Sequence, residues 1–225
     1  MRMLLGIYFL LYYWDLLCHY FGIRGIIIFV KVSRASIKHQ TSVIKLQVCL
    51  LGTARSLQKD LEQLAEVADT SNSEGLNYIL KEATLISLRH PDFCISGYSS
   101  VNLKKSMEDG EKLFDHFSIE ERGNLDEETL FNVNNIKRKT GKRRQSEIVS
   151  RNEYIVMTIL VATEGTQDFP IINSSADLKA ALQNLGSISP KKTLAVEVLW
   201  TLQEENDTLS EQELLVKYPL LKPLH

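Results

Sequence analysis

A short irregular segment, residues 89–100 (RHPDFCISGYSS), gathers the side chains best suited to chemistry in this chain. It combines a helix end, a proline, a glycine and several hydroxyls, and binding residues are often found in such segments. We take Arg89, His90, Asp92 and Tyr98 as a candidate binding patch. The structural alternative, a turn that holds the edge of a sheet, is favoured over it.

The sequence holds few other signs of catalysis. His90 and Cys94 are four residues apart, but a second pair of metal ligands is missing, which favours a helix-end histidine bonded to a carbonyl. The sequence has no phosphate-cradling glycine loop, no zinc spacing and no nucleophile elbow. We therefore expect no cofactor, no metal and no catalytic residue, and an enzyme is the less favoured alternative.

Composition and charge limit which class of protein this chain can be. The chain has 225 residues, of which 44% are hydrophobic and 24% charged, and its net charge is −2. These values suit one globular domain with an appendage. The basic run Lys137–Arg144 (KRKTGKRR) lacks aromatic neighbours, so it favours a solvated loop, and no nucleic-acid partner is expected. Cys18, Cys49 and Cys94 are odd in number and far apart, which favours free thiols.

The strands are predicted from apolar runs. Ile155–Ala162 is rich in β-branched residues and indicates a central strand covered on both faces. Val43–Leu51 alternates, which predicts a half-buried strand with Lys45 outward. Leu194–Trp200 predicts a further strand, and Phe93–Val101 a weak strand or an ordered loop because Gly97 interrupts it.

Helices are predicted from apolar spacing and capping residues. They are Ala54–Ala68, Glu74–Arg89 capped by Ser73, Asn102–Phe117, a turn opened by Ser118 with Glu121, Leu125–Ile136, Ala176–Leu185 capped by Ser175, and a short helix capped by Ser210 with Glu213.

Together these elements predict an α+β domain over residues 41–225. Its centre is a small three- to four-stranded sheet with helices packed on it. The strand–helix–strand order of residues 155–200 predicts a parallel pair joined by a right-handed crossover, if the two strands share a sheet.

Residues 1–40 form a separate apolar segment with a basic flank. Residues 3–30 are long enough to span a membrane but contain Asp15 and Arg24, each of which costs about 2.5–3.5 kcal/mol near the bilayer centre. A membrane anchor is the first expectation. A targeting segment, a misassigned start of the coding sequence and a stretch folded into the core are the alternatives.

Five stretches of the chain carry a family resemblance. They resemble a plant and cyanobacterial family of uncharacterised membrane proteins that share a domain of unknown function. The plant members of this family resemble proteins of chloroplast acclimation to fluctuating light. The stretches are residues 45–66, 69–101, 108–135, 152–165 and 194–215.

The resemblance implies a chloroplast membrane protein, in the thylakoid or envelope, whose domain faces the stroma. It implies a regulator of photoprotective acclimation that acts through an unidentified protein partner, and it carries over no catalytic residue and no cofactor. Residues 1–40 have neither the transit composition nor the glycine-rich run that family members have. An enzyme or small-ligand binder with its site at residues 89–100 is the alternative.

Overall fold

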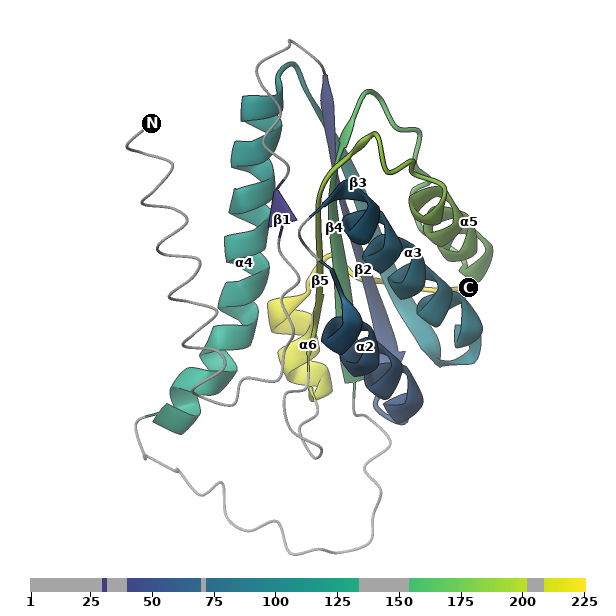
Figure 1. Ribbon diagram of the computed structural model, residues 1–225. Coiled ribbons are helices and arrows are strands. Elements are labelled where there is room, and N and C mark those ends of the chain that lie inside the picture. The colour runs from purple at the N-terminus through teal and green to yellow at the C-terminus, as the bar shows by residue number, and fades with distance from the viewer. Residues whose placement is uncertain (1–29, 32–39, 70–71, 134–153, 202–208) are drawn as a thin grey trace, which may run out of the picture.

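The centre of the fold is an antiparallel sheet with the strand order β1-β5-β4-β2-β3-β6 (Figure 1). This computed structural model describes residues 30–31, 40–69, 72–133, 154–201 and 209–225. The strands are β1 Val30–Lys31, β2 Thr41–Leu51, β3 Cys94–Lys104, β4 Tyr154–Glu164, β5 Thr193–Trp200 and β6 Lys222–Pro223. The α+β prediction is confirmed. The predicted sheet corresponds to the four long strands, and two-residue strands at both edges extend it.

Helices cover both faces of the sheet (Figure 1). One face carries α2 (Arg55–Val67), α3 (Ser73–Arg89) and α5 (Ser175–Gly186), and the other carries α4 (Met107–Val133) and α6 (Glu211–Lys217). The larger apolar core lies under α2, α3 and α5, where leucine and isoleucine side chains meet the sheet. Smaller apolar clusters lie under α4 and under α6.

The two central strands, β2 and β4, are buried along almost their whole length. The prediction of a doubly covered central strand at residues 155–162 is confirmed. The prediction of a half-buried β2 is wrong, because on that face α4 covers Lys45 and Gln47, and α6 with its flanking residues covers Cys49. Two charged or amide side chains of β2 therefore lie inside the protein.

The connection from β4 to β5 differs from the predicted parallel crossover. The two strands pair antiparallel, with Ile159 opposite Val198. The irregular segment after β4 runs back along β3, where the Pro170 carbonyl accepts a hydrogen bond from Ser99 Oγ and Ile172 packs on Gly97. Helix α5 then returns the chain to the end it came from, so β5 runs opposite to β4.

The region from β3 to α4 also differs from its prediction. The ladder between β2 and β3 continues to Lys104, so Asn102 lies in a strand and does not begin a helix. Ser106 caps α4, because its Oγ accepts a hydrogen bond from the Asp109 backbone N–H at 3.1 Å. The helix continues through Ser118 and Glu121, so they open no new turn. Helix α4 therefore combines the predicted helix Asn102–Phe117 with the predicted helix Leu125–Ile136, which it follows up to Val133. Residues 134–136 lie outside the described residues.

Three other caps can be compared with their predictions. Asn72 Oδ1 caps α3 by accepting from the Gly75 N–H at 2.8 Å, one residue before the predicted Ser73. Likewise Ser174, one residue before Ser175, caps α5. The capping box of Ser210 with Glu213 at the start of α6 is confirmed.

Most of the predicted N-terminal segment lies outside the described residues, apart from β1, in which Val30 pairs with Val196 at the edge of β5. The basic run 137–144 and Cys18 also lie outside them. None of the helices that the structure describes has the length and apolar character needed to cross a bilayer.

Candidate functional site

A buried polar cluster lies between α4 and the sheet, and Glu121 is at its centre. Its Oε1 accepts hydrogen bonds from Lys45 Nζ at 2.9 Å and from Gln47 Nε2 at 2.8 Å. Its Oε2 accepts one from Thr158 Oγ1 at 2.9 Å. The three donors come from β2 and β4, the two central strands. Both carboxylate oxygens are therefore satisfied by the sheet.

Lys45 is held in this cluster by more than one anion. Its Nζ also lies 3.3 Å from Glu120 Oε2 and 4.7 Å from the centre of the Phe117 ring. Burial acts to lower the pKa of Lys45, but the charges and hydrogen bonds of Glu121 and Glu120 outweigh it and raise that pKa above its ordinary value. Lys45 is therefore a charged group inside the protein.

A second ion pair joins α4 to β5. Arg122 Nε donates a hydrogen bond to Glu197 Oε1 at 2.9 Å, Arg122 Nη2 lies 2.8 Å from the same oxygen, and Glu197 is fully buried. Its other oxygen, Oε2, has no hydrogen-bond partner among the described residues. Burial raises the pKa of Glu197, and the charge of Arg122 opposes that shift only in part.

The cluster suits a structural task better than catalysis. Glu121 and Glu197 are almost completely covered, and the narrow gap that Glu121 lines, between β4, the end of β5 and Tyr218, has no room for a water molecule. A substrate needs an open cavity with convergent polar groups. The cluster instead fixes the rotation and height of α4 on the sheet, since its hydrogen bonds form in one register.

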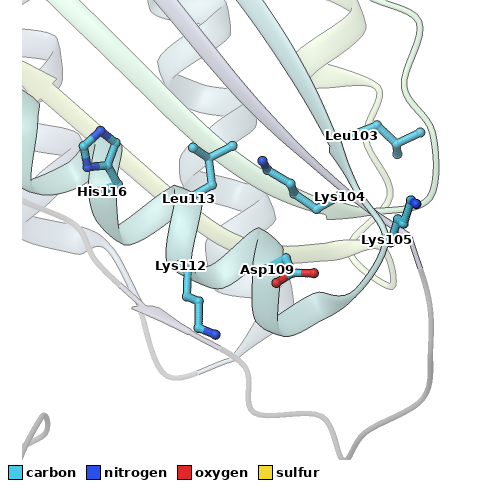
Figure 2. Close-up of a pocket in the computed structure, with 7 residues that line it drawn as sticks. All are labelled: Leu103, Lys104, Lys105, Asp109, Lys112, Leu113 and His116. Carbon is cyan, nitrogen blue, oxygen red and sulfur yellow. The ribbon is translucent and has the colours of Figure 1, made fainter.

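An open groove of about 490 Å³ lies where β3 ends and α4 begins (Figure 2). Asp109, Lys112, Leu113 and His116 are spaced by three and four residues, so they follow one side of α4. The other lining residues are Leu103, Lys104 and Lys105, which come from the end of β3 and the turn that follows.

The groove carries more positive than negative charge. Lys112 Nζ forms an exposed ion pair with Glu108 Oε1 at 2.8 Å. Asp109 Oδ2 accepts a hydrogen bond from Ser106 Oγ at 2.8 Å. Lys104 and Lys105 form no ion pair with any described residue. Figure 2 shows Lys104 reaching from β3 toward Leu113, while Lys112 points away from it. The uncompensated charge therefore lies at the β3 end.

The structure separates the residues of the predicted patch. Arg89 ends α3, His90 follows it, and Asp92 lies in the 3₁₀ turn Pro91–Phe93, so these three adjoin one another. Tyr98 lies opposite Gln47 in the ladder of β2 and β3. Directly opposed residues share a face, and the Gln47 side chain reaches α4, so Tyr98 lies on the face away from α3.

The contacts near His90 are with other parts of the protein. Its Nε2 lies 3.6 Å from Asp60 Oδ2 of α2, and its ring centre lies 6.0 Å from that of Phe93. Cys94 Sγ donates a weak hydrogen bond to the His90 carbonyl. No group of three potential metal ligands is found among the described residues. The binding patch stays a prediction.

Sequence reasoning missed the polar cluster, although part of the signal was visible. Glu197 is a single charge in the apolar strand LAVEVLW, and a charge in a buried strand calls for a partner. The spacing of Glu121 three residues after Ser118 predicts a capping box and hides its role in the cluster. The partners come from segments about 75 residues apart, a distance in sequence that local patterns cannot bridge.

The predicted free thiols are confirmed for the two cysteines that the structure describes. Burial raises the pKa of Cys49 to about 12 and that of Cys94 to about 11. Both thiols are therefore protonated and weakly nucleophilic near neutral pH.

Comparison with known proteins places the domain in a family. A family model described as a protein of unknown function (DUF1517) matches residues 40–224. The FLUCTUATING-LIGHT-ACCLIMATION protein 1, chloroplastic, of Arabidopsis thaliana is 62% identical over 185 residues, which are 82% of this chain and 47% of that protein. Protein FLAP1 homolog A of Synechocystis is 40% identical over 195 residues, which are 84% of this chain and 58% of that protein.

The chain spans about half the length of the curated relatives it matches. No solved structure is significantly similar to it. The family model nevertheless covers the whole sheet from β2 onward together with the helices on both faces, including the polar cluster and the groove. The chain belongs to the DUF1517 family of proteins of unknown function.

Proposed function

We propose that this chain acts in chloroplast acclimation to changing light, as a binding domain that works through a protein partner. The observation that carries the proposal is the 62% identity with the Arabidopsis protein, whose name states both the chloroplast and fluctuating light. Within that process we assign the chain to photoprotection, as the resemblance found in its sequence implies.

The distribution of polar groups supports binding over catalysis. The buried carboxylates Glu121 and Glu197 are engaged with the sheet and with α4. The open groove holds three lysines, one aspartate, two leucines and a histidine. Such a set can attract and orient a partner. It offers no activated nucleophile with an adjacent base, which acyl transfer and hydrolysis by covalent catalysis need.

We also propose that the protein is attached to a chloroplast membrane, thylakoid or envelope, with the domain in the stroma. The support is the apolar segment at residues 3–30 and the basic residues Lys31, Arg34 and Lys38 that follow it, since positive flanks favour the side that is not translocated.

A domain exchange tests the role in light acclimation. Residues 40–224 would replace the matching region of the Arabidopsis relative in plants that lack it. We expect chlorophyll fluorescence under alternating light to return to the wild-type time course. The control is the relative without that region, which should give no recovery. Correct accumulation of the exchanged protein without recovery would refute the role.

Membrane attachment is tested separately. The full chain and a version that starts at Thr41, each with a C-terminal fluorescent tag, would be expressed in plant cells and their membranes washed at alkaline pH. We expect only the full chain to resist the wash in a chloroplast membrane. Equal extraction of both versions would contradict an anchor in residues 1–40.

A further inference from the structure

The outer edge of β3 is paired over only a small part of its length. Strand β6 pairs with Ser96 and Gly97, and the Leu224 N–H donates to the Ile95 carbonyl. Beyond Gly97 no described strand pairs with this edge as far as Lys104. The side chain of Ser99, not its backbone, makes the hydrogen bond to Pro170. Alternate backbone groups of residues 98–104 therefore point outward with no strand beside them.

The basic groove adjoins this edge. Lys104 and Lys105 stand at its end without an ion pair among the described residues, and His116 lines the groove further along α4. Leu103 at the end of β3 is 47% exposed, and Leu113 of α4 is half-buried, with the Lys104 side chain between them (Figure 2). An extended segment lying along β3 would thus meet backbone hydrogen-bonding groups along the strand and the positive charge of Lys104 and Lys105 at its end.

We propose that the edge of β3 from Tyr98 to Lys104 accepts an extended acidic segment of a partner protein as an added antiparallel or parallel strand. The backbone ladder would supply affinity, and carboxylates of the segment near the end of the ladder would meet the positive charge of Lys104 and Lys105, which selects for acidic sequences. This inference rests on the proposed function, because it names the chemistry of the partner on which that function depends.

A protein segment fits this surface better than an anionic lipid headgroup does. Headgroups can neutralise lysines, but they cannot use a row of outward N–H and C=O groups spaced along a strand. Lysines on an edge strand can also serve only to keep other strands away. The two roles differ in what they predict, because guarding lysines give no binding of an acidic strand.

The test measures binding of labelled peptides to the purified full chain by fluorescence anisotropy. The probe is a short peptide in which Glu alternates with Val, and a peptide with Lys in place of Glu is its charge control. Two further probes carry methyl groups on alternate backbone nitrogens, one in each register, because a methylated nitrogen cannot join a ladder. Vesicles of phosphatidylglycerol and phosphatidylcholine are tested in parallel.

Three double variants separate this surface from general electrostatics. Lys104→Glu with Lys105→Glu reverses the charge of the groove, and Lys104→Gln with Lys105→Gln is a milder pair for use if the first does not fold. The matched control is Lys81→Glu with Lys179→Glu, which makes the same charge change on α3 and α5, across the sheet. The Glu pair should weaken acidic peptide binding by about tenfold and the control by less than about twofold.

The expected pattern has three parts. The acidic peptide binds more tightly than the basic one, its affinity falls with added salt, and methylation in one register abolishes binding. Equal binding by the wild type and the Lys104/Lys105 variants would overturn the proposal. So would undiminished binding of both methylated probes, or binding of vesicles through these lysines without binding of the peptide. The domain exchange described above is unaffected by those results, so the light-acclimation role stands or fails separately.

Discussion

Lys45 Nζ lies 2.9 Å from Glu121 Oε1, and the two side chains are 6% and 3% exposed. Glu120, the next residue along α4, is 53% exposed and lies 3.3 Å from the same nitrogen. One lysine therefore has a buried anion and a solvated anion as neighbours. Removing one member of a buried pair leaves an uncompensated charge, whereas solvated pairs contribute little.

Glu121→Gln should lower the free energy of unfolding by about 3 kcal/mol, because Lys45 loses its buried counter-ion. Glu120→Gln makes the same chemical change at the solvated position and should cost less than about 1 kcal/mol. Urea unfolding of the two variants at neutral pH measures the difference. Equal losses would mean that burial of the pair does not set its strength.

The coupling between these residues can be measured directly. Lys45→Met combined with Glu121→Gln removes both charges, so it should cost less than the sum of the two single variants, by about 1–3 kcal/mol. A double-mutant cycle in urea gives this value. Strict additivity would show that the two side chains act independently in spite of their contact.

The elements of this fold were predictable where a pattern is local. The apolar run of β4, the alternation of β5 and the capping box at Ser210 each predict their element from a few residues. The strand β3 was predicted only weakly, because Gly97 weakens a strand unless something fills the space beside it. Here Ile172, from a segment far along the chain, fills that space.

The candidate site was less predictable than the fold. Lys45 and Glu197 each stand out in an apolar strand, but their partners lie on α4, about 75 residues away in the sequence. Met107, Leu113 and Phe114 indicate which side of α4 meets the sheet, but no local pattern links Glu121 or Arg122 to a particular strand. The groove depends on where β3 ends, and the sequence placed that end three residues too early. Both errors come from contacts between distant segments.

Gly97→Ala should destabilise the protein by about 1–3 kcal/mol, since an added Cβ would lie 2.9 Å from Ile172 Cγ2 inside a packed core. Gly123→Ala is the matched control, because it lies on the exposed side of α4 with no atom within 4 Å of the added Cβ. It should raise stability by up to about 1 kcal/mol. Thermal unfolding measures both changes.

A second substitution checks the cause of the Gly97 effect. Ile172→Leu moves the branch of the side chain from Cβ to Cγ and so removes the Cγ2 atom that the new Cβ would meet. Combined with Gly97→Ala, it should recover part of the lost stability. No recovery would place the strain in the β3 backbone.

The pH dependence of stability should reveal the buried carboxyl of Glu197. Burial raises its pKa in the folded state above the ordinary value of 4.5, so the folded protein binds the proton more tightly than the unfolded chain does. The protonated Glu197 carboxyl therefore contributes to the free energy of unfolding at low pH. That contribution is lost as the pH rises from about 4.5 through the raised pKa that Glu197 has in the folded protein.

Glu197→Gln removes that titration. The unfolding free energy of this variant relative to wild type should rise with pH over the same window, whatever the constant cost of leaving Arg122 without its counter-ion. Urea unfolding at several pH values gives the difference, in which other titrating groups cancel. A difference that stays constant or falls with pH would contradict a raised pKa at Glu197.

The thiols provide a test of local burial that needs no unfolding. Cys94 is partly exposed with a pKa raised from 9.0 to about 11, and Cys49 is fully buried with a pKa raised to about 12. At pH 8 the thiolate fraction of Cys94 is then about a hundredfold below that of an unperturbed thiol.

In a Cys18→Ser background, iodoacetamide should modify Cys94 slowly and Cys49 only when β2 is released from α6 and the sheet opens. Mass spectrometry of timed samples, with the urea-unfolded chain as the control for full reactivity, measures both rates. Faster modification of Cys49 than of Cys94 would contradict this order. It would show that α6 separates from β2 more readily than Cys94 becomes exposed on β3.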